Sequence, residues 1–245
     1  MALLAFGFFI TALLYASVGF GGGSTYSALL SLYGLDYRLL PIVSLACNIV
    51  VVTGGTIRFA GAGQVPWRSA LALSLIAAPL AFLGGLTPVR EETFLALLGL
   101  SLILAGLVLL LPRAGLDGGR PRTSARFMGM AAAPLGYLSG LVGIGGGIFL
   151  APLLHLTRWN GARQIAATTS LFILINSLAG LAGQLVRHGA DRFGDALESA
   201  APLLLAVIVG GQIGSILASR LLAERTIRGL TAGLTIWTGS RLLLG

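Results

Sequence analysis

Gly19-Phe20-Gly21-Gly22-Gly23 returns 124 residues later as Gly143-Ile144-Gly145-Gly146-Gly147, and each copy sits inside a long apolar stretch and precedes another apolar run. Glycine inside a helix costs roughly 1 kcal/mol relative to alanine, so three adjacent glycines predict an interruption of the helix. Irregular backbone at membrane depth is tolerated where it is buried in protein or lines a cavity. Two such breaks therefore indicate a duplicated membrane protein with a binding site at the breaks.

The composition places the chain in a lipid bilayer. Of 245 residues, 56% are hydrophobic and 10% are charged, and the mean hydropathy is +0.93, whereas a soluble domain carries about 25% charged residues. Runs of about 20 apolar residues are needed to cross the hydrocarbon core. The long runs are residues 2–18, 39–57, 69–86, 93–111, 127–142, 164–186, 200–219 and 229–244, and two shorter ones, 24–33 and 148–157, follow the glycine clusters. Charges fall between the runs and not along one face of each, which argues against a soluble bundle.

The charged and reactive residues exclude several classes of function. The net charge of +8 comes from arginine alone, without a basic helix face or basic-aromatic motif, so we expect no nucleic-acid partner. Cys47 is the single cysteine, and neither His155 nor His188 has a neighbour at ligand spacing, so we expect no metal and no cofactor. The glycines lack the spacing of a nucleotide-binding loop, and Ser24 has no nearby base, so we expect no enzyme activity.

The two halves of the chain align along their whole length. With the glycine clusters superposed, Leu29-Leu30 falls on Leu153-Leu154, and Gly84-Gly85 falls on Gly210-Gly211 after a small gap. The predicted fold is therefore an all-α polytopic membrane protein of two homologous repeats, each with a glycine-broken segment and three transmembrane helices. The repeats cover residues 1–112 and 127–245, and a polar linker, 113–126, joins them on the cytoplasmic side.

Arginine counts bear on the topology. If each broken segment crosses the membrane once, the sixteen arginines divide nine to seven between the two sides. If each segment enters and returns on one side, they divide eleven to five, and the five are Arg38, Arg90, Arg187, Arg192 and Arg241. Because cytoplasmic loops carry the excess of positive charge, the second topology, in which each broken segment enters and returns on one side, is favoured. It predicts an inverted pair of repeats whose glycine tips meet near the midplane.

The residues around the glycine clusters suit an anion. A helix that restarts after Gly23 or Gly147 presents unpaired N–H groups at the positive end of its dipole. Hydroxyl and amide side chains in the same and neighbouring segments add donors, although serine and threonine also cement helix contacts. Asn176 matches Asn48 if the alignment is shifted by two further residues. The predicted substrate-binding residues are Gly21, Gly22, Gly23, Ser24, Thr25, Ser44, Asn48, Gly145, Gly146, Gly147, Thr168, Thr169, Ser170 and Asn176.

Other polar and small residues have simpler interpretations. The eight acidic residues are expected in or beside loops, which disfavours a buried carboxylate relay. Arg58 is the arginine nearest to a span interior. It could contact an anion, but we expect its long side chain to extend (snorkel) to the membrane interface instead. Gly136 and Gly140 are four residues apart and predict close packing of two helices.

A glycine cluster followed by an apolar half-helix, in both halves of a chain of this length, resembles the TauE/SafE family of sulfite and organosulfonate exporters. The likeness is clearest over residues 143–154 and 166–171, and the first half departs from it at Ala28 and Val43, which stand where the second has Pro152 and Thr169. The resemblance implies export of a small anion, such as sulfite or sulfoacetate, by a multi-pass protein of the bacterial inner membrane. An anion channel and a non-transporting membrane scaffold are the alternatives, and a homodimer is left open.

Overall fold

The computed structural model describes residues 1–17, 19–110, 124–217 and 224–244, and over these residues the chain is helical without strands. The first part comprises α1 (Ala2–Ser17), α2 (Gly23–Leu32), α3 (Leu40–Gly61), α4 (Trp67–Leu86) and α5 (Glu91–Leu110). The second part comprises α6 (Ala125–Val142), α7 (Gly147–Leu156), α8 (Ala162–His188), α9 (Ala190–Ser199), α10 (Ala201–Leu217) and α11 (Glu224–Leu244). The predicted all-α class is confirmed, and most of the predicted linker lies outside the described residues.

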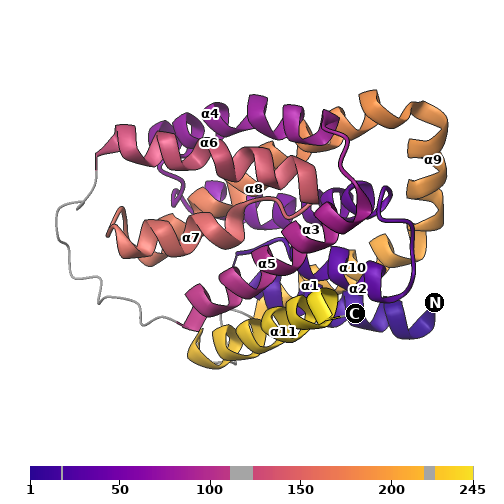
Figure 1. Cartoon of the computed structure of the whole chain (residues 1–245). Coiled ribbons are helices and arrows are strands. Elements are labelled where there is room, and N and C mark those ends of the chain that lie inside the picture. The colour runs from indigo at the N-terminus through magenta and orange to yellow at the C-terminus, as the bar shows by residue number, and fades with distance from the viewer. Residues whose placement is uncertain (18, 111–123, 218–223, 245) are drawn as a thin grey trace.

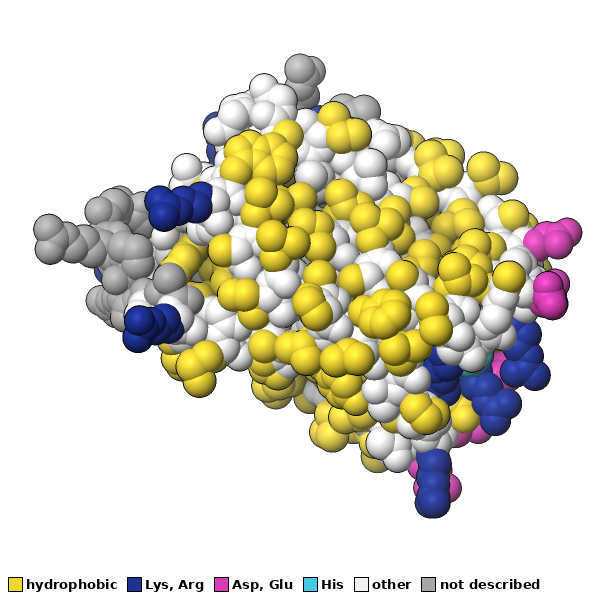
Figure 2. Space-filling model, turned by 90° about the horizontal axis from the view of Figure 1, so that it is seen from above, with side chains coloured by type: hydrophobic (Ala, Val, Ile, Leu, Met, Phe, Trp, Pro, Cys, Tyr) yellow, Lys and Arg dark blue, Asp and Glu magenta, His cyan; other side chains and the backbone are white. Residues whose placement is uncertain are grey.

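The helices have the lengths that a bilayer requires. Among the described residues, α3, α4, α5 and α8 are long and apolar enough to cross a membrane. The pair α9 and α10 gives a fifth candidate if it is taken as one span bent by 58°. Figure 2 shows one face of the molecule, where hydrophobic side chains cover the middle and charged side chains gather at the two ends. The chain is a multi-pass membrane protein.

Both glycine clusters lie at the tips of helical hairpins. The amino group of Met1, before α1, donates a hydrogen bond of 2.9 Å to the hydroxyl of Tyr33, after α2. In the second part, Thr157 Oγ1, after α7, donates to Met128 Sδ in the first turn of α6 at 3.9 Å. The chain thus returns after each break to the end of the bundle from which it came, as α6 and α7 show in Figure 1.

The two hairpins point in from opposite ends of the bundle. Tyr37, which follows the first hairpin, donates from its hydroxyl to the carbonyl of Val89 at 3.4 Å, so this hairpin opens at the end where α4 leads into α5. The second hairpin opens at the other end, where α5 finishes and α6 begins (Figure 1). We name this second end the linker end. Helix α1 packs against α10 and α6 packs against α4, so each hairpin is held by a helix from the other part of the chain.

The predicted close packing at Gly136 and Gly140 is confirmed between α6 and α4. A methyl group on Gly140 would lie 2.7 Å from the carbonyl carbon of Ala81, and one on Gly136 would lie 2.8 Å from Cβ of Ala77. Neither position has room for any side chain, because backbone faces backbone along this contact. The pair therefore sets the distance between the two helices.

We expect Gly140→Ala to destabilise the protein by roughly 1–3 kcal/mol, because the added methyl group overpacks the contact with α4. Gly61→Ala is the matched control, since a methyl group at Gly61 meets nothing within 4 Å. It should leave stability unchanged or raise it by up to about 1 kcal/mol through helix propensity. Thermal unfolding of the two purified variants checks this, and equal melting temperatures would contradict the packing argument.

One helix is absent from the predicted elements. The acidic residues Asp191, Asp195 and Glu198 were expected in or beside a loop, and they lie on the exposed face of α9. Phe193, Ala196 and Leu197 form its other, more buried face. Their spacing of three and four residues is helical, but the charges between them interrupt the apolar run on which the span predictions rest. In Figure 1, α9 runs across the direction of the other helices at one end of the bundle.

Candidate functional site

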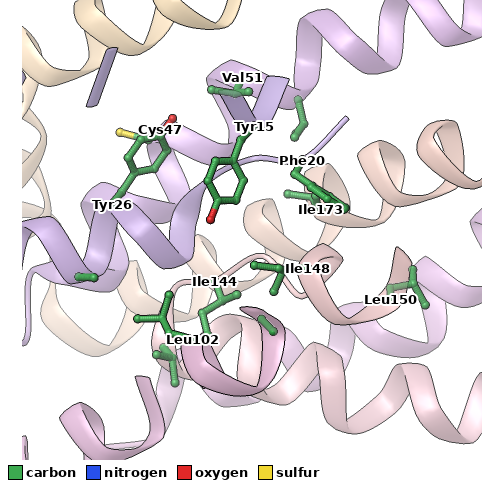
Figure 3. Packing of buried hydrophobic residues seen from close by; sticks show 14 of the residues in the cluster. Tyr15, Phe20, Tyr26, Cys47, Val51, Leu102, Ile144, Ile148, Leu150 and Ile173 are labelled. Atoms are coloured by element: carbon green, nitrogen blue, oxygen red, sulfur yellow. The ribbon is translucent and has the colours of Figure 1, made fainter. Parts of the chain in front are cut away.

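The two glycine breaks touch inside the bundle. Gly22 and Gly146 are the N-caps of α2 and α7, with φ of 83° and 72°, a conformation that favours glycine. A methyl group on Gly23 would lie 2.6 Å from the carbonyl oxygen of Gly143, so neither break leaves space for a side chain where they meet. Figure 3 shows Ile144 and Ile148 of the second break facing the side of the core that holds Tyr15.

Asn48 of α3 joins the two breaks. Its side chain is fully buried, and its Oδ1 accepts a hydrogen bond of 2.8 Å from the backbone N–H of Gly23, which fixes the orientation of the amide. Its Nδ2 lies between the two breaks: a methyl group on Gly145 would lie 2.7 Å from it, and one on Gly23 would also collide with it. This Nδ2 has no hydrogen-bond partner among the described residues. A buried amide donor thus stands unpaired between the breaks.

Helix α8 covers the second break. A methyl group on Gly147 would lie 2.9 Å from Cγ2 of Thr169, and one on Gly145 would lie 2.9 Å from Cγ2 of Ile173. Thr168 and Thr169 are fully buried, and the hydroxyl of each has no partner within the described part of the chain. Unpaired polar groups in an apolar interior are costly, so they call for a ligand or a change of state.

The other predicted hydroxyls hold the breaks in place. Thr25 shares a hydrogen bond of 2.8 Å with the hydroxyl of Tyr15, which joins α2 to α1. Ser44 accepts a bond of 2.7 Å from Ser27, and Ser170 donates one of 3.0 Å to the carbonyl of Gly19. Ser24 is buried in the first turn of α2. Thr25, Ser44 and Ser170 therefore form hydrogen bonds between neighbouring segments, which is the structural role given above as the alternative to substrate binding.

The matching of Asn176 with Asn48 is wrong. On α8 it is Ile173 that faces Gly145 and Gly147, as Asn48 on α3 faces Gly21 and Gly23. Asn176 lies almost one turn further along, and its Nδ2 donates to the carbonyl of Phe172 at 2.8 Å. Residues three apart lie on the same side of a helix but at different heights, and alignment of the two halves alone could not decide which of them stands level with the break. The amide that reaches between the breaks therefore comes from the first half of the chain, and an isoleucine stands in its place in the second.

Two tyrosines were missed in the sequence because they lie within apolar runs. Tyr26 stacks on Phe8 with ring centroids 4.7 Å apart, and its hydroxyl is buried without a partner among the described residues. A methyl group on Gly22 would lie 3.1 Å from that hydroxyl. Tyr26 contacts Gly22 and Tyr15 bonds to Thr25, so both tyrosines line the first break. The signal that could have found Tyr26 is its position four residues after Gly22, one helical turn into α2.

Comparison with known proteins gives a consistent result. The family model described as "Sulfite exporter TauE/SafE" matches residues 3–242. A "probable membrane transporter protein" of Sinorhizobium fredii is 35% identical over 245 residues, which cover 98% of this chain and 97% of that protein. Another of the same description, from Xylella fastidiosa, is 29% identical over 230 residues, 88% of this chain and 84% of its own length. No solved structure gives a significant match.

Proposed function

The chain belongs to the sulfite exporter TauE/SafE family, and from this premise we propose that it is a secondary transporter that exports a small anion, such as sulfite or an organosulfonate, across the bacterial inner membrane. The observation that carries the proposal is the Nδ2 of Asn48, which is fully buried between the two glycine breaks and has no partner among the described residues. An anion accepts hydrogen bonds, and a buried donor without an acceptor suits such a ligand.

The donors around Asn48 suit an oxyanion. Helix α7 begins at Gly147, and the first N–H groups of a helix lack partners within the helix and carry its positive partial charge. The methyl group of Thr169 faces Gly147, and the hydroxyls of Thr169 and its neighbour Thr168 are buried without a partner among the described residues, so we take them as further donors from α8. Helix α2 contributes less, because Asn48 already accepts from its first N–H group at Gly23. We place the anion between Asn48 and the start of α7.

We further propose that both hairpins are re-entrant and that the two repeats are inverted relative to each other. The contacts of Met1 with Tyr33 and of Thr157 with Met128 support the first point, and the opening of the hairpins at opposite ends supports the second. Under this topology eleven of the sixteen arginines belong to the side of the linker end, which identifies that side as cytoplasmic.

Ligand-induced stabilisation of the purified protein tests the proposed function. We expect sulfite or a small sulfonate to raise the melting temperature more than neutral or cationic solutes of the same size, because a ligand that binds the folded state stabilises it, by about 2.7 kcal/mol at a hundredfold excess over Kd. Sulfate, taurine and carboxylates complete the panel. Stabilisation by cations or neutral solutes alone would contradict the assignment of an anion site.

A further inference from the structure

Three arginines and a histidine come together at the end of the bundle opposite the linker end, which we call the outer end. Arg38 lies in the connection before α3, and Arg192 lies in the first turn of α9. Arg187 and His188 are the last two residues of α8. All three arginine charges act on the imidazole of His188, and that of Arg38 also acts on Arg187, so the four side chains are neighbours. Figure 2 shows basic side chains next to a histidine at one end of the molecule. We call these four residues the basic cluster.

Folding alone does not favour this arrangement. Under the proposed topology the outer end lies outside the cytoplasm, where short loops carry few basic residues. Five arginines are on this side, and three of them belong to the basic cluster. Like charges that lie close together repel each other, so an anion among them would lower the free energy of the arrangement. The low expectation for arginine on this side follows from the proposed topology, whereas the contacts of the cluster do not depend on it.

Neutral groups hold two of the arginines in place. Nη1 of Arg187 donates to the carbonyl oxygen of Thr87, after α4, at 3.0 Å. Nε of Arg38 donates to the hydroxyl of Tyr37 at 3.3 Å, and the guanidinium carbon lies 5.5 Å from the centroid of that ring. A guanidinium has five N–H donors, and each of these bonds uses one. Both arginines are therefore positioned by the protein and keep donors for a ligand.

The nearby carboxylates do not neutralise the cluster. Asp36 and Glu91 act on Arg38, but within the described ranges neither forms an ion pair with it. Asp36 instead accepts from the backbone N–H of Arg38 at 3.0 Å. Of the acidic residues in the described part of the chain, Asp36 alone acts on His188, and its effect is smaller than that of each arginine. Arg192 is exposed and has no hydrogen-bond or ion-pair partner among the described residues.

His188 adds a ring nitrogen without a partner. Its Nε2 is buried and forms no hydrogen bond with any described residue. This nitrogen can donate to an oxyanion when it carries a proton, and the doubly protonated ring adds a positive charge. The three arginines oppose that charge, and Asp36 favours it only weakly, so the ring gains its second proton more readily when an anion lies among the arginines. An anion and a proton should therefore bind here together.

We propose that the basic cluster is a second oxyanion site, at the outer end of the bundle. Guanidinium groups from three elements of the chain and Nε2 of His188 suit a small group with several oxygens on sulfur or phosphorus. A free sulfonate and the phosphate of an anionic lipid headgroup share this chemistry. Arg187 lies 18 residues, or about 27 Å, along α8 from Thr169, so this site is separate from the one at the glycine breaks and does not rest on the proposed function.

The imidazole NMR signals of the purified protein test the site, because the chain has only two histidines, His155 and His188. The probe is methanesulfonate, which keeps one negative charge throughout the pH range in which histidine titrates. We expect it to perturb the signal of His188, assigned with His188→Gln, and to move the titration of that signal to higher pH. The signal of His155 should not change. A His188 signal that responds neither to methanesulfonate nor to anionic lipid would overturn the site.

Substitution of the arginines tests whether the cluster holds the anion. Arg38→Gln and Arg192→Gln should each raise about tenfold the methanesulfonate concentration that gives half of the change at His188. Arg241→Gln is the matched control, since Arg241 is an exposed arginine assigned to the same side and its charge does not act on His188. It should leave that concentration unchanged. The same concentration in all three variants would overturn the role of the cluster.

Two preparations distinguish the sources of the oxyanion. A response to methanesulfonate in lipid-free detergent supports a site for a free anion. A response that appears only in nanodiscs with phosphatidylglycerol, and not with phosphatidylcholine alone, supports a site for an anionic headgroup. Asn48→Asp, which removes the amide donor at the breaks, should keep the response of His188, and loss of the response would overturn a second site. An intact response in a protein that transports no anion would contradict the proposed function alone.

Discussion

Asn48→Asp should abolish anion transport while the protein stays folded. Aspartate has nearly the shape of asparagine and still offers an oxygen to the N–H of Gly23, so the start of α2 keeps its cap. It lacks the Nδ2 donor and places a carboxylate where the transported anion is expected. Loss of a hydrogen bond to a charged group costs about 1.5–3 kcal/mol, and like-charge repulsion adds to it. We therefore expect the initial rate of uptake to fall by at least about 100-fold, which corresponds to about 2.7 kcal/mol.

The measurement is uptake of a labelled anion into vesicles, normalised to the folded protein that they contain. Asn48→Leu is the comparison, because it removes both the donor and the cap of Gly23. It should abolish transport and also lower stability by roughly 1–3 kcal/mol, since the buried N–H of Gly23 loses its partner. Transport by Asn48→Asp at the rate of the parent protein would remove Asn48 from the site.

Gly143→Ala should cause a large loss of both stability and transport. Gly143 has φ of 80°, and a methyl group there would lie 2.7 Å from Cα of Pro41. A left-handed conformation costs a side-chain-bearing residue about 1–2 kcal/mol, and overpacking costs typically about 1–3 kcal/mol more. We expect destabilisation of roughly 2–5 kcal/mol as the sum of these two costs. Displacement of the break should stop flux.

Substitutions at two other glycines measure the backbone strain and the overpacking separately. Gly34 has φ of 77° and open space around it, so Gly34→Ala should show the backbone strain alone and leave transport intact. Gly23 lacks a positive φ but faces the carbonyl oxygen of Gly143, so Gly23→Ala should show crowding alone and impair transport. Thermal unfolding and vesicle uptake, measured together, distinguish them. A Gly143→Ala protein no less stable than Gly34→Ala would show that the breaks are not tightly packed.

Local patterns predicted the breaks and the helices well, because helix formation and apolar length are properties of short segments. Three glycines in a row placed the starts of α2 and α7 at Gly23 and Gly147. Helix α9 was not predicted, because a hydropathy average over this segment includes the charged residues of its exposed face. Its apolar positions, Phe193 and Ala196, are visible only as a helical periodicity.

The site could be predicted only in part, because its geometry depends on how helices are rotated against each other. Asn48 was identified as a polar residue in an apolar span, but its place between both breaks requires the packing of α3 against two hairpins. Ser170 and Thr169 are neighbours in sequence, yet one is bonded to a carbonyl and the other is unpaired.

The occurrence of an asparagine at 48 and an isoleucine at 173 has a consequence for the design of simpler versions of the molecule. A symmetric dimer built from two copies of the second half would carry isoleucine at both of these places, so it would keep the hydroxyls of Thr168 and Thr169 but lose the central amide. A dimer built from two copies of the first half would carry that amide twice. A designer who wished to keep it would therefore duplicate residues 1–112 rather than 127–245.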